Sequence, residues 1–268
     1  MTDTPFEHIQ DDAAFLRLEL SVQEMASLSV NHDFGETEIR AITEVLRYLR
    51  DKKRDQIVTT LLRMSRLPLR EPKTFENFEF GRLHGKQAET LKTLPSLNAL
   101  YAHRNLALIG PPGVGKTHLA MAYGRACCEN GQKCYFLKAT ELNQRLVEAR
   151  KYGREMSTIN GLVKPSCLII DEVGHCEFDK ENTRLFFDLV DRRYNKEGSN
   201  NIVFTSNRNP ALWKDNFSDD DSLLCSLDRI FDDATVFTLR GESFRGKNLE
   251  KISLQTSRVR TSFEAPAS

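Results

Sequence analysis

The sequence predicts an α/β protein in which helices flank a parallel sheet, preceded by a small all-α domain. From residue 106 onward, short apolar runs of strand length alternate with longer helical patterns, which is typical of β/α units. The first third instead has apolar residues spaced three and four apart, as in helices that bury one face. We therefore expect a helical domain over 1–73, an α/β domain over 74–250, and a disordered tail over 251–268.

Bulk composition places limits on function. The 268 residues carry 38 Lys plus Arg and 38 Asp plus Glu, so any nucleic-acid partner must be met by a local basic patch. No apolar run approaches the roughly 20 residues that span a bilayer, and the N-terminus is polar and acidic. We expect a cytoplasmic chain with no membrane partner. The six cysteines lack a C-x-x-C pair, so we expect reduced thiols.

Charge is uneven along the helical domain. Residues 1–38 hold nine acids and one base, whereas residues 40–73 hold ten bases and four acids. The spacing of Ile42, Val45, Leu46 and Leu49 predicts an amphipathic helix with a basic outer face, which Pro68 ends. Most such faces are simply solvated, and the alternative is contact with DNA phosphates. The candidate DNA contacts are Arg47, Arg50, Lys52, Lys53 and Arg54, together with a second basic surface at Arg145, Arg150, Lys151 and Arg154.

Two segments lead into the α/β domain. The acidic and aromatic stretch from Thr74 to Phe80 is expected to pack on the core, and a role near a nucleotide base stays open. The stretch from Leu91 to Leu106 is expected to be helical with a break at Pro95.

A glycine-rich loop joins the apolar run 106–109 to a helix beginning at His118, with the sequence Gly110-Pro111-Pro112-Gly113-Val114-Gly115-Lys116-Thr117. Its spacing fits G-x-x-x-x-G-K-T, in which backbone N–H groups wrap a nucleotide phosphate and glycine permits the close approach. Lys116 would lie between the β- and γ-phosphates of ATP, and the Thr117 hydroxyl would bind Mg²⁺. A plain glycine turn is the alternative, but the preceding strand and the following helix disfavour it. We assign the loop and His118 to nucleotide binding.

The remaining elements alternate in the order that a parallel sheet requires. We expect strands over 133–138, 167–170, 201–207 and 234–239, and helices over 118–130, 141–151, 181–195 and 222–231.

Polar residues follow two of these strands at the sheet edge where α/β proteins bind ligands. Asp171 and Glu172 end the run 167–170; Asp171 is suited to hold Mg²⁺ and Glu172 to polarise the attacking water. Asn207 is placed to orient the same water, although a turn-forming role before Pro210 competes. Arg229 and Arg245 could stabilise charge on the γ-phosphate or form surface ion pairs.

Taken in order, these motifs resemble the IstB/DnaC group of AAA+ ATPases, and IstB-like transposon helper proteins more closely. The motifs are 110–117, Leu168-Ile-Ile-Asp-Glu172, Thr205-Ser-Asn207, Leu227-Asp-Arg-Ile230 and Gly241-Glu-Ser-Phe-Arg245. The resemblance assigns Lys116 and Thr117 to Walker A, Asp171 and Glu172 to Walker B, Asn207 to sensor 1, Arg245 to sensor 2 and Arg229 to an arginine finger. Many IstB proteins have a second aspartate where this chain has Glu172, and glutamate here favours a competent base.

The resemblance implies an Mg²⁺-dependent ATPase that oligomerises on duplex DNA with ATP at subunit interfaces. Such an oligomer would select or remodel target DNA and recruit or stimulate a partner transposase. Hydrolysis would then loosen the assembly.

Three other functions stay open. A DnaC-like replicative helicase loader would favour single strands. A P-loop kinase would need a phosphoacceptor, and Asn207 and Arg229 argue against it. A nucleotide-gated interaction module would turn over little ATP.

Overall fold

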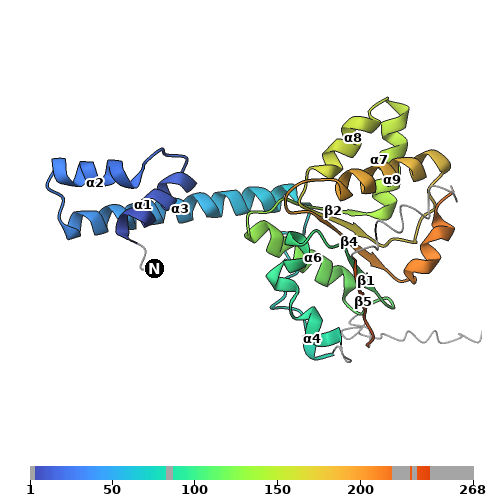
Figure 1. The fold of residues 1–268 in the computed structure, drawn as a ribbon. Coiled ribbons are helices and arrows are strands. Elements are labelled where there is room, and N and C mark those ends of the chain that lie inside the picture. The colour runs from blue at the N-terminus through green and yellow to red at the C-terminus, as the bar shows by residue number, and fades with distance from the viewer. Residues whose placement is uncertain (1–3, 83–86, 219–229, 231–233, 242–268) are drawn as a thin grey trace, which may run out of the picture.

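The structure is a computed structural model that describes residues 4–82, 87–218, 230 and 234–241 (Figure 1). Three helices come first, followed by an α/β unit with five strands in the described part of the chain. The helices are α1 Pro5–Phe15, α2 Val22–Asn31, α3 Glu36–Met64, α4 Gln87–Leu91, α5 Asn98–Tyr101, α6 Lys116–Glu129, α7 Ala139–Lys151, α8 Glu155–Val163 and α9 Lys180–Tyr194, with short 3₁₀ turns η1 Phe80–Arg82, η2 Leu94–Ser96 and η3 Pro210–Asn216. The strands are β1 Leu106–Ile109, β2 Cys134–Lys138, β3 Cys167–Asp171, β4 Asn201–Ser206 and β5 Thr235–Thr238.

The five strands form one parallel sheet in the order β2-β3-β4-β1-β5. Side chains alternate between its faces, so Leu106 and Leu108 join α6 and the 67–100 segment in one core. Ala107 and Ile109 join α7, α8 and α9 in the other core, on the opposite side of the sheet (Figure 1). The predicted α/β class with a parallel sheet and preceding helices is confirmed. Helix α8 was not predicted, and the helix expected over 222–231 lies outside the described residues except Ile230.

Helix α1 packs against the first half of α3, and α2 packs against α1 (Figure 1). Capping boxes, in which Thr4 pairs with Glu7 and Ser21 with Glu24, satisfy the free N–H groups at the start of α1 and α2. At the packed face, the nearly buried Asp12 accepts a 2.6 Å hydrogen bond from Arg50.

The helix predicted here is present as α3, but its apolar stripe is only partly covered. Val45 and Leu49 are exposed, Ile42 and Leu46 are half-buried, and every residue over 51–57 is exposed. The reason is length: the 29-residue helix is about 43 Å long, and α1 packs on its first half. Figure 1 shows α3 extending from α1 and α2 to the α/β unit.

The end of α3 is fixed to the α/β unit. Leu61 and Leu62 pack against the core on the α6 side, and Leu67 is buried within it. The carbonyl oxygen of Ser65 accepts a 2.8 Å hydrogen bond from the backbone N–H of Phe136 in β2. The helical arm is therefore anchored directly to an edge strand of the sheet.

Arg193, near the end of α9, is almost completely buried at the end of the sheet where β3 and β4 begin. Its guanidinium donates to five backbone carbonyl oxygens where α8 ends and β3 begins, those of Leu162, Val163, Pro165, Ser166 and Asn201. Burial lowers its pKa to about 10. The Arg193 side chain thus joins α9 by hydrogen bonds to the segment between α8 and β3 and to the start of β4.

Replacing Arg193 with Met should lower the free energy of unfolding by about 3 kcal/mol, because several buried carbonyl groups would lose their donors. The neighbouring Arg192→Met should cost less than about 1 kcal/mol, because its pair with Asp188 is partly exposed. Urea unfolding followed by circular dichroism measures both. Equal losses in the two variants would contradict the role given to Arg193.

Candidate nucleotide-binding site

The glycine-rich loop lies between β1 and α6, at the carboxyl end of the sheet. Gly113 and Gly115 have φ values of 84° and 93°, in the left-handed region that favours glycine. A Cβ at Gly110 would collide with the carbonyl oxygen of Leu239. Val114 anchors the loop because its side chain is buried in the core. The loop is thereby shaped to present backbone N–H groups to an anion at the start of α6.

Lys116 is folded over this loop and is largely buried. Its ammonium donates 2.8 Å hydrogen bonds to the carbonyl oxygens of Gly110 and Pro111. The charge is therefore held at the mouth of the loop, where a phosphate chain would lie.

Asp171 joins three elements at this edge of the sheet. Its Oδ1 accepts hydrogen bonds from the Thr117 hydroxyl of α6, at 2.8 Å, and from the Thr205 hydroxyl of β4, at 2.5 Å. Asp171 is buried, and burial raises the pKa of its carboxyl above the usual value. Hydroxyl and carboxylate oxygens are the hard donors that Mg²⁺ prefers, so Thr117 and Asp171 fit this ion.

Glu172 leaves β3 in a left-handed conformation, with a φ of 61°. Its backbone N–H donates to the Thr205 hydroxyl at 3.0 Å, and its carboxylate lies 2.9 Å from the Lys138 ammonium. This strained position turns the side chain out of the sheet toward the nucleotide cavity.

Asn207 lies just beyond β4, on the neighbouring strand, and faces the same cavity. Its side-chain nitrogen is 3.1 Å from Nε2 of His175. Three separate segments of the sequence therefore line a single cavity, with Lys116 and Thr117 from the first, Glu172 from the second and Asn207 from the third.

The cavity has a volume of about 440 Å³, which is in the range of small-ligand sites. One wall comes from the phosphate-binding loop and α6, and another from the segment that precedes the α/β unit. That second wall consists of Lys73, Asn77, Phe78 and Glu79.

His118 and Phe78 connect these two walls. Nε2 of His118 is 2.9 Å from the carbonyl oxygen of Thr74, and its ring lies against Phe78 with centroids 5.3 Å apart. Burial lowers the pKa of His118. His118 lines the cavity, and its assignment to nucleotide binding stays a prediction. The wall from Lys73 to Glu79 was not assigned from the sequence, where the run of aromatic residues at 75–80 was its only signal.

The basic residues on α3 fall into two groups. Arg47 pairs with Glu44, and Arg50 pairs with Asp12 and Asp51. Within the described part of the chain, no ion pair engages the next three basic residues, which are exposed: Lys52, Lys53 and Arg54.

The basic residues on α7 and beyond are mostly engaged locally. Arg145 donates a 2.6 Å hydrogen bond to the Tyr135 hydroxyl, and Lys151 lies over the ring of Tyr152. Arg154 precedes α8 and lines a surface hollow with Arg145.

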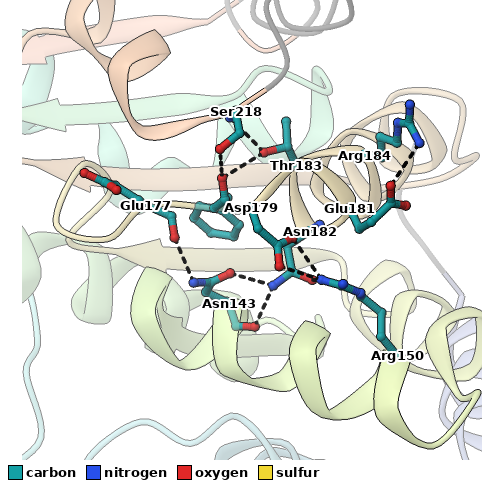
Figure 2. A network of polar contacts seen from close by, with 10 residues as sticks. Asn143, Arg150, Glu177, Asp179, Glu181, Asn182, Thr183, Arg184 and Ser218 are labelled. Carbon is teal, nitrogen blue, oxygen red and sulfur yellow. Dashed lines mark hydrogen bonds and ion pairs between the residues drawn. The ribbon is translucent and has the colours of Figure 1, made fainter.

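Arg150 reaches from α7 to the start of α9, as Figure 2 shows. Its Nη1 lies 2.7 Å from Asp179, the N-cap of α9, and 3.1 Å from Asn182. The amide of Asn182 in turn donates to Asn143 of α7. Arg150 therefore fastens two helices together, whereas Arg229 and Arg245 lie outside the described residues.

Among the described helices, none combines the length and apolar character needed to cross a bilayer. The glycine-rich loop, the acidic strand end and the β2-β3-β4-β1-β5 sheet define a P-loop nucleotide-binding fold of the AAA+ type.

The chain belongs to the IstB-like ATP binding protein family, whose family model matches residues 13–252. It is 30% identical to a protein described as an ATP-binding protein of insertion sequence IS232 from Bacillus thuringiensis subsp. berliner, covering 91% of this chain and 96% of that protein. It is 34% identical to the corresponding IS21 protein of Pseudomonas aeruginosa, covering 73% and 72%.

Solved structures show the same fold. The DnaC helicase loader superposes with a TM-score of 0.52 at 18% identity, covering 63% of this chain and 97% of that one. AMPPCP-bound DnaA from Aquifex aeolicus gives a TM-score of 0.50 at 25% identity, covering 62% and 50%. This chain therefore has the sheet and loop of AAA+ nucleotide-binding proteins.

Asp171→Asn should separate stability from activity. Burial raises the pKa of the Asp171 carboxyl, so ionisation of this group lowers the free energy of unfolding of the nucleotide-free protein. This loss of stability develops as the pH rises through the folded-state pKa. The Asp171→Asn variant should therefore have a free energy of unfolding about 1 kcal/mol higher than that of the wild type at neutral pH. At a pH below the ordinary pKa of aspartate, this difference should disappear. ATP hydrolysis with Mg²⁺ should fall at least about 100-fold.

Urea unfolding at the two pH values and a phosphate-release assay measure these effects. An Asp171→Asn chain that is less stable at neutral pH, or that hydrolyses ATP normally, would contradict the role of this carboxylate.

Proposed function

We propose that this protein is an ATP-dependent DNA-binding helper of transposition that hydrolyses ATP with Mg²⁺. The observation that carries the proposal is the gathering of Lys116, Thr117, Glu172 and Asn207 around one cavity, in a chain whose relatives are ATP-binding proteins of insertion sequences. The helper oligomerises on duplex DNA, selects or remodels the target and recruits or stimulates a partner transposase.

The chemistry follows from the residues at the cavity. The loop N–H groups and Lys116 bind the phosphate chain, which orients the γ-phosphate toward the strand ends. Thr117 and Asp171 would hold Mg²⁺, which would supply positive charge to neutralise the phosphate chain. Glu172 accepts a proton from the attacking water, and Asn207 orients that water.

Two predicted arginines extend this site beyond one subunit. Arg229 acts as a finger on the ATP of a neighbouring subunit, and Arg245 senses the γ-phosphate within its own subunit. Since an interface that contains ATP forms only when ATP is bound, oligomerisation is coupled to the nucleotide.

The uncovered turn of α3 is the preferred DNA contact. Lys52, Lys53 and Arg54 lie in the stretch 51–57 of α3, where every residue is exposed, so their charges are available to phosphates. Arg150 is the least available of the candidates because Asp179 and Asn182 hold its guanidinium.

The central test is fluorescence anisotropy of matched duplex and single-stranded DNA with a non-hydrolysable ATP analogue, with ADP and with no nucleotide. We expect cooperative, salt-sensitive duplex binding that needs the analogue and is lost in Lys116→Ala. Preference for single strands would favour the helicase loader, and binding to neither DNA would refute both functions.

Glu172→Gln should bind ATP and DNA but hydrolyse ATP at least about 100-fold more slowly, because the amide cannot accept the water proton. Phosphate release and anisotropy on the same sample measure this trapped state. Normal hydrolysis in this variant would rule out Glu172 as the base.

Replacing Lys52, Lys53 and Arg54 together with Ala should weaken duplex binding and reduce the slope of log K against log salt by up to about 3, one for each DNA phosphate that these side chains neutralise. A triple variant with the same charge change, Lys92→Ala, Lys180→Ala and Arg184→Ala, is the control and should keep the wild-type slope. Identical slopes in both variants would move the DNA contact away from α3.

A further inference from the structure

Lys196 lies in the turn between α9 and β4, at the end of the sheet opposite the nucleotide cavity. Its ammonium donates hydrogen bonds to two carbonyl oxygens of the segment between α8 and β3, that of Lys164 at 3.0 Å and that of Pro165 at 2.9 Å. The Pro165 carbonyl also accepts a hydrogen bond from Arg193. The two basic side chains therefore hold the same segment, although Lys196 is only half-buried.

The charged groups that act on Lys196 are cations. Burial, the Arg193 guanidinium and the Lys133 ammonium, in that order, lower the pKa of Lys196 to about 8. Arg193 belongs to α9, and Lys133 directly precedes β2. Within the described part of the chain, no ion pair joins Lys196 to a carboxylate, not even to Glu197 beside it in the sequence. The positive charge of Lys196 is therefore not compensated.

The two hydrogen bonds of Lys196 can survive the loss of its charge. An ammonium has three N–H groups, whereas a neutral amine has two and a lone pair. The carbonyl oxygens of Lys164 and Pro165 can each accept one N–H of the neutral amine, so that the lone pair remains free. Partial burial and neighbouring cations are the conditions that turn a lysine into a nucleophile.

The surroundings of Lys196 also favour an anionic reagent. Lys133 is half-buried and Lys164 is exposed, and neither forms an ion pair with any residue that the structure describes. Their charges can therefore attract an anion to this end of the sheet. An acyl phosphate carries its negative charge next to its reactive carbon, so the cations that attract its phosphate would bring that carbon close to the Lys196 amine.

We propose that Lys196 is a modification site that is selectively acylated by small acyl phosphates. The amine nitrogen attacks the acyl carbon and forms a C–N bond. The C–O bond to phosphate breaks, phosphate leaves with that electron pair, and the amine proton passes to water. The product is a neutral amide with a single N–H, so one of the two hydrogen bonds to Lys164 and Pro165 is lost. Acylation thus loosens the contact between the end of α9 and the segment before β3.

The alternative is a purely structural lysine that holds two carbonyl groups and reacts no faster than any other lysine. The two possibilities differ in the rate of acylation at this residue relative to an exposed lysine of the same molecule. Lys180 is a suitable reference because it is exposed at the opposite end of the same helix, α9.

The test treats the full chain with acetyl phosphate near neutral pH and follows acetylation of each lysine by peptide mass spectrometry. We expect Lys196 to react at least about tenfold faster than Lys180. The reason is that a lysine with a pKa of about 8 holds far more unprotonated amine near neutral pH than one with the ordinary value of about 10.4. Equal rates at the two residues would overturn the inference.

A charge variant tests whether the neighbouring cations activate Lys196. Lys133→Met should slow acetylation of Lys196 about threefold, because it removes a charge that disfavours the ammonium form. Lys92→Met is the control: it removes the same charge from an exposed pair with Glu89 and should leave the rate at Lys196 unchanged. Equal rates in the two variants would contradict the role given to the cations.

A second reagent tests the class of acyl donor. The acetyl ester of N-hydroxysuccinimide is uncharged, so it should acetylate Lys196 in preference to Lys180 less strongly than acetyl phosphate does. Excess inorganic phosphate should reduce the preference only with acetyl phosphate. The same preference with both reagents would rule out acyl phosphates as the selected donor.

Discussion

One buried carboxylate fixes the arrangement of the nucleotide site. Oδ1 of Asp171 accepts hydrogen bonds from a hydroxyl at the start of α6 and from a hydroxyl on β4, so three elements meet at one atom. The Thr205 hydroxyl also accepts the N–H of Glu172, which fixes the backbone from which the proposed base projects. Asp171 is buried where these elements meet, and burial disfavours the ionised form of its carboxyl and so raises the pKa. The two hydroxyl donors partly offset this cost, so the same hydrogen bonds that join the three elements also stabilise the carboxylate.

The sequence was most informative where function depends on local chain geometry. A glycine loop between a strand and a helix, and carboxylates at the end of a buried run, are consequences of neighbours in the chain, and the structure contains both. Lys138 could not be identified in this way, because nothing local indicates that the end of β2 meets Glu172 across the sheet. The wall formed by Lys73 to Glu79 and the exposure of Val45 likewise depend on tertiary packing.

Polar side chains do much of the fastening between helices in the α/β unit. Arg150, Asp179 and Asn182 join α7 to the start of α9 (Figure 2). Arg193 joins α9 to the starts of β3 and β4 through backbone carbonyl groups. The sequence alone therefore does not distinguish an arginine that contacts DNA from one that stabilises the fold, because the same guanidinium can bind a phosphate or a helix end. Arg150 and Lys53 illustrate the two outcomes: one is occupied within the fold, and the other is exposed.

The uncovered part of α3 also sets a distance. Twelve residues separate Lys53 from the anchor at Ser65, and at the helical rise they amount to about 18 Å. A partner bound at Lys53 would be separated by this distance from the point where the end of α3 meets the α/β unit. Because a helix without a kink curves only gently, this separation stays nearly constant.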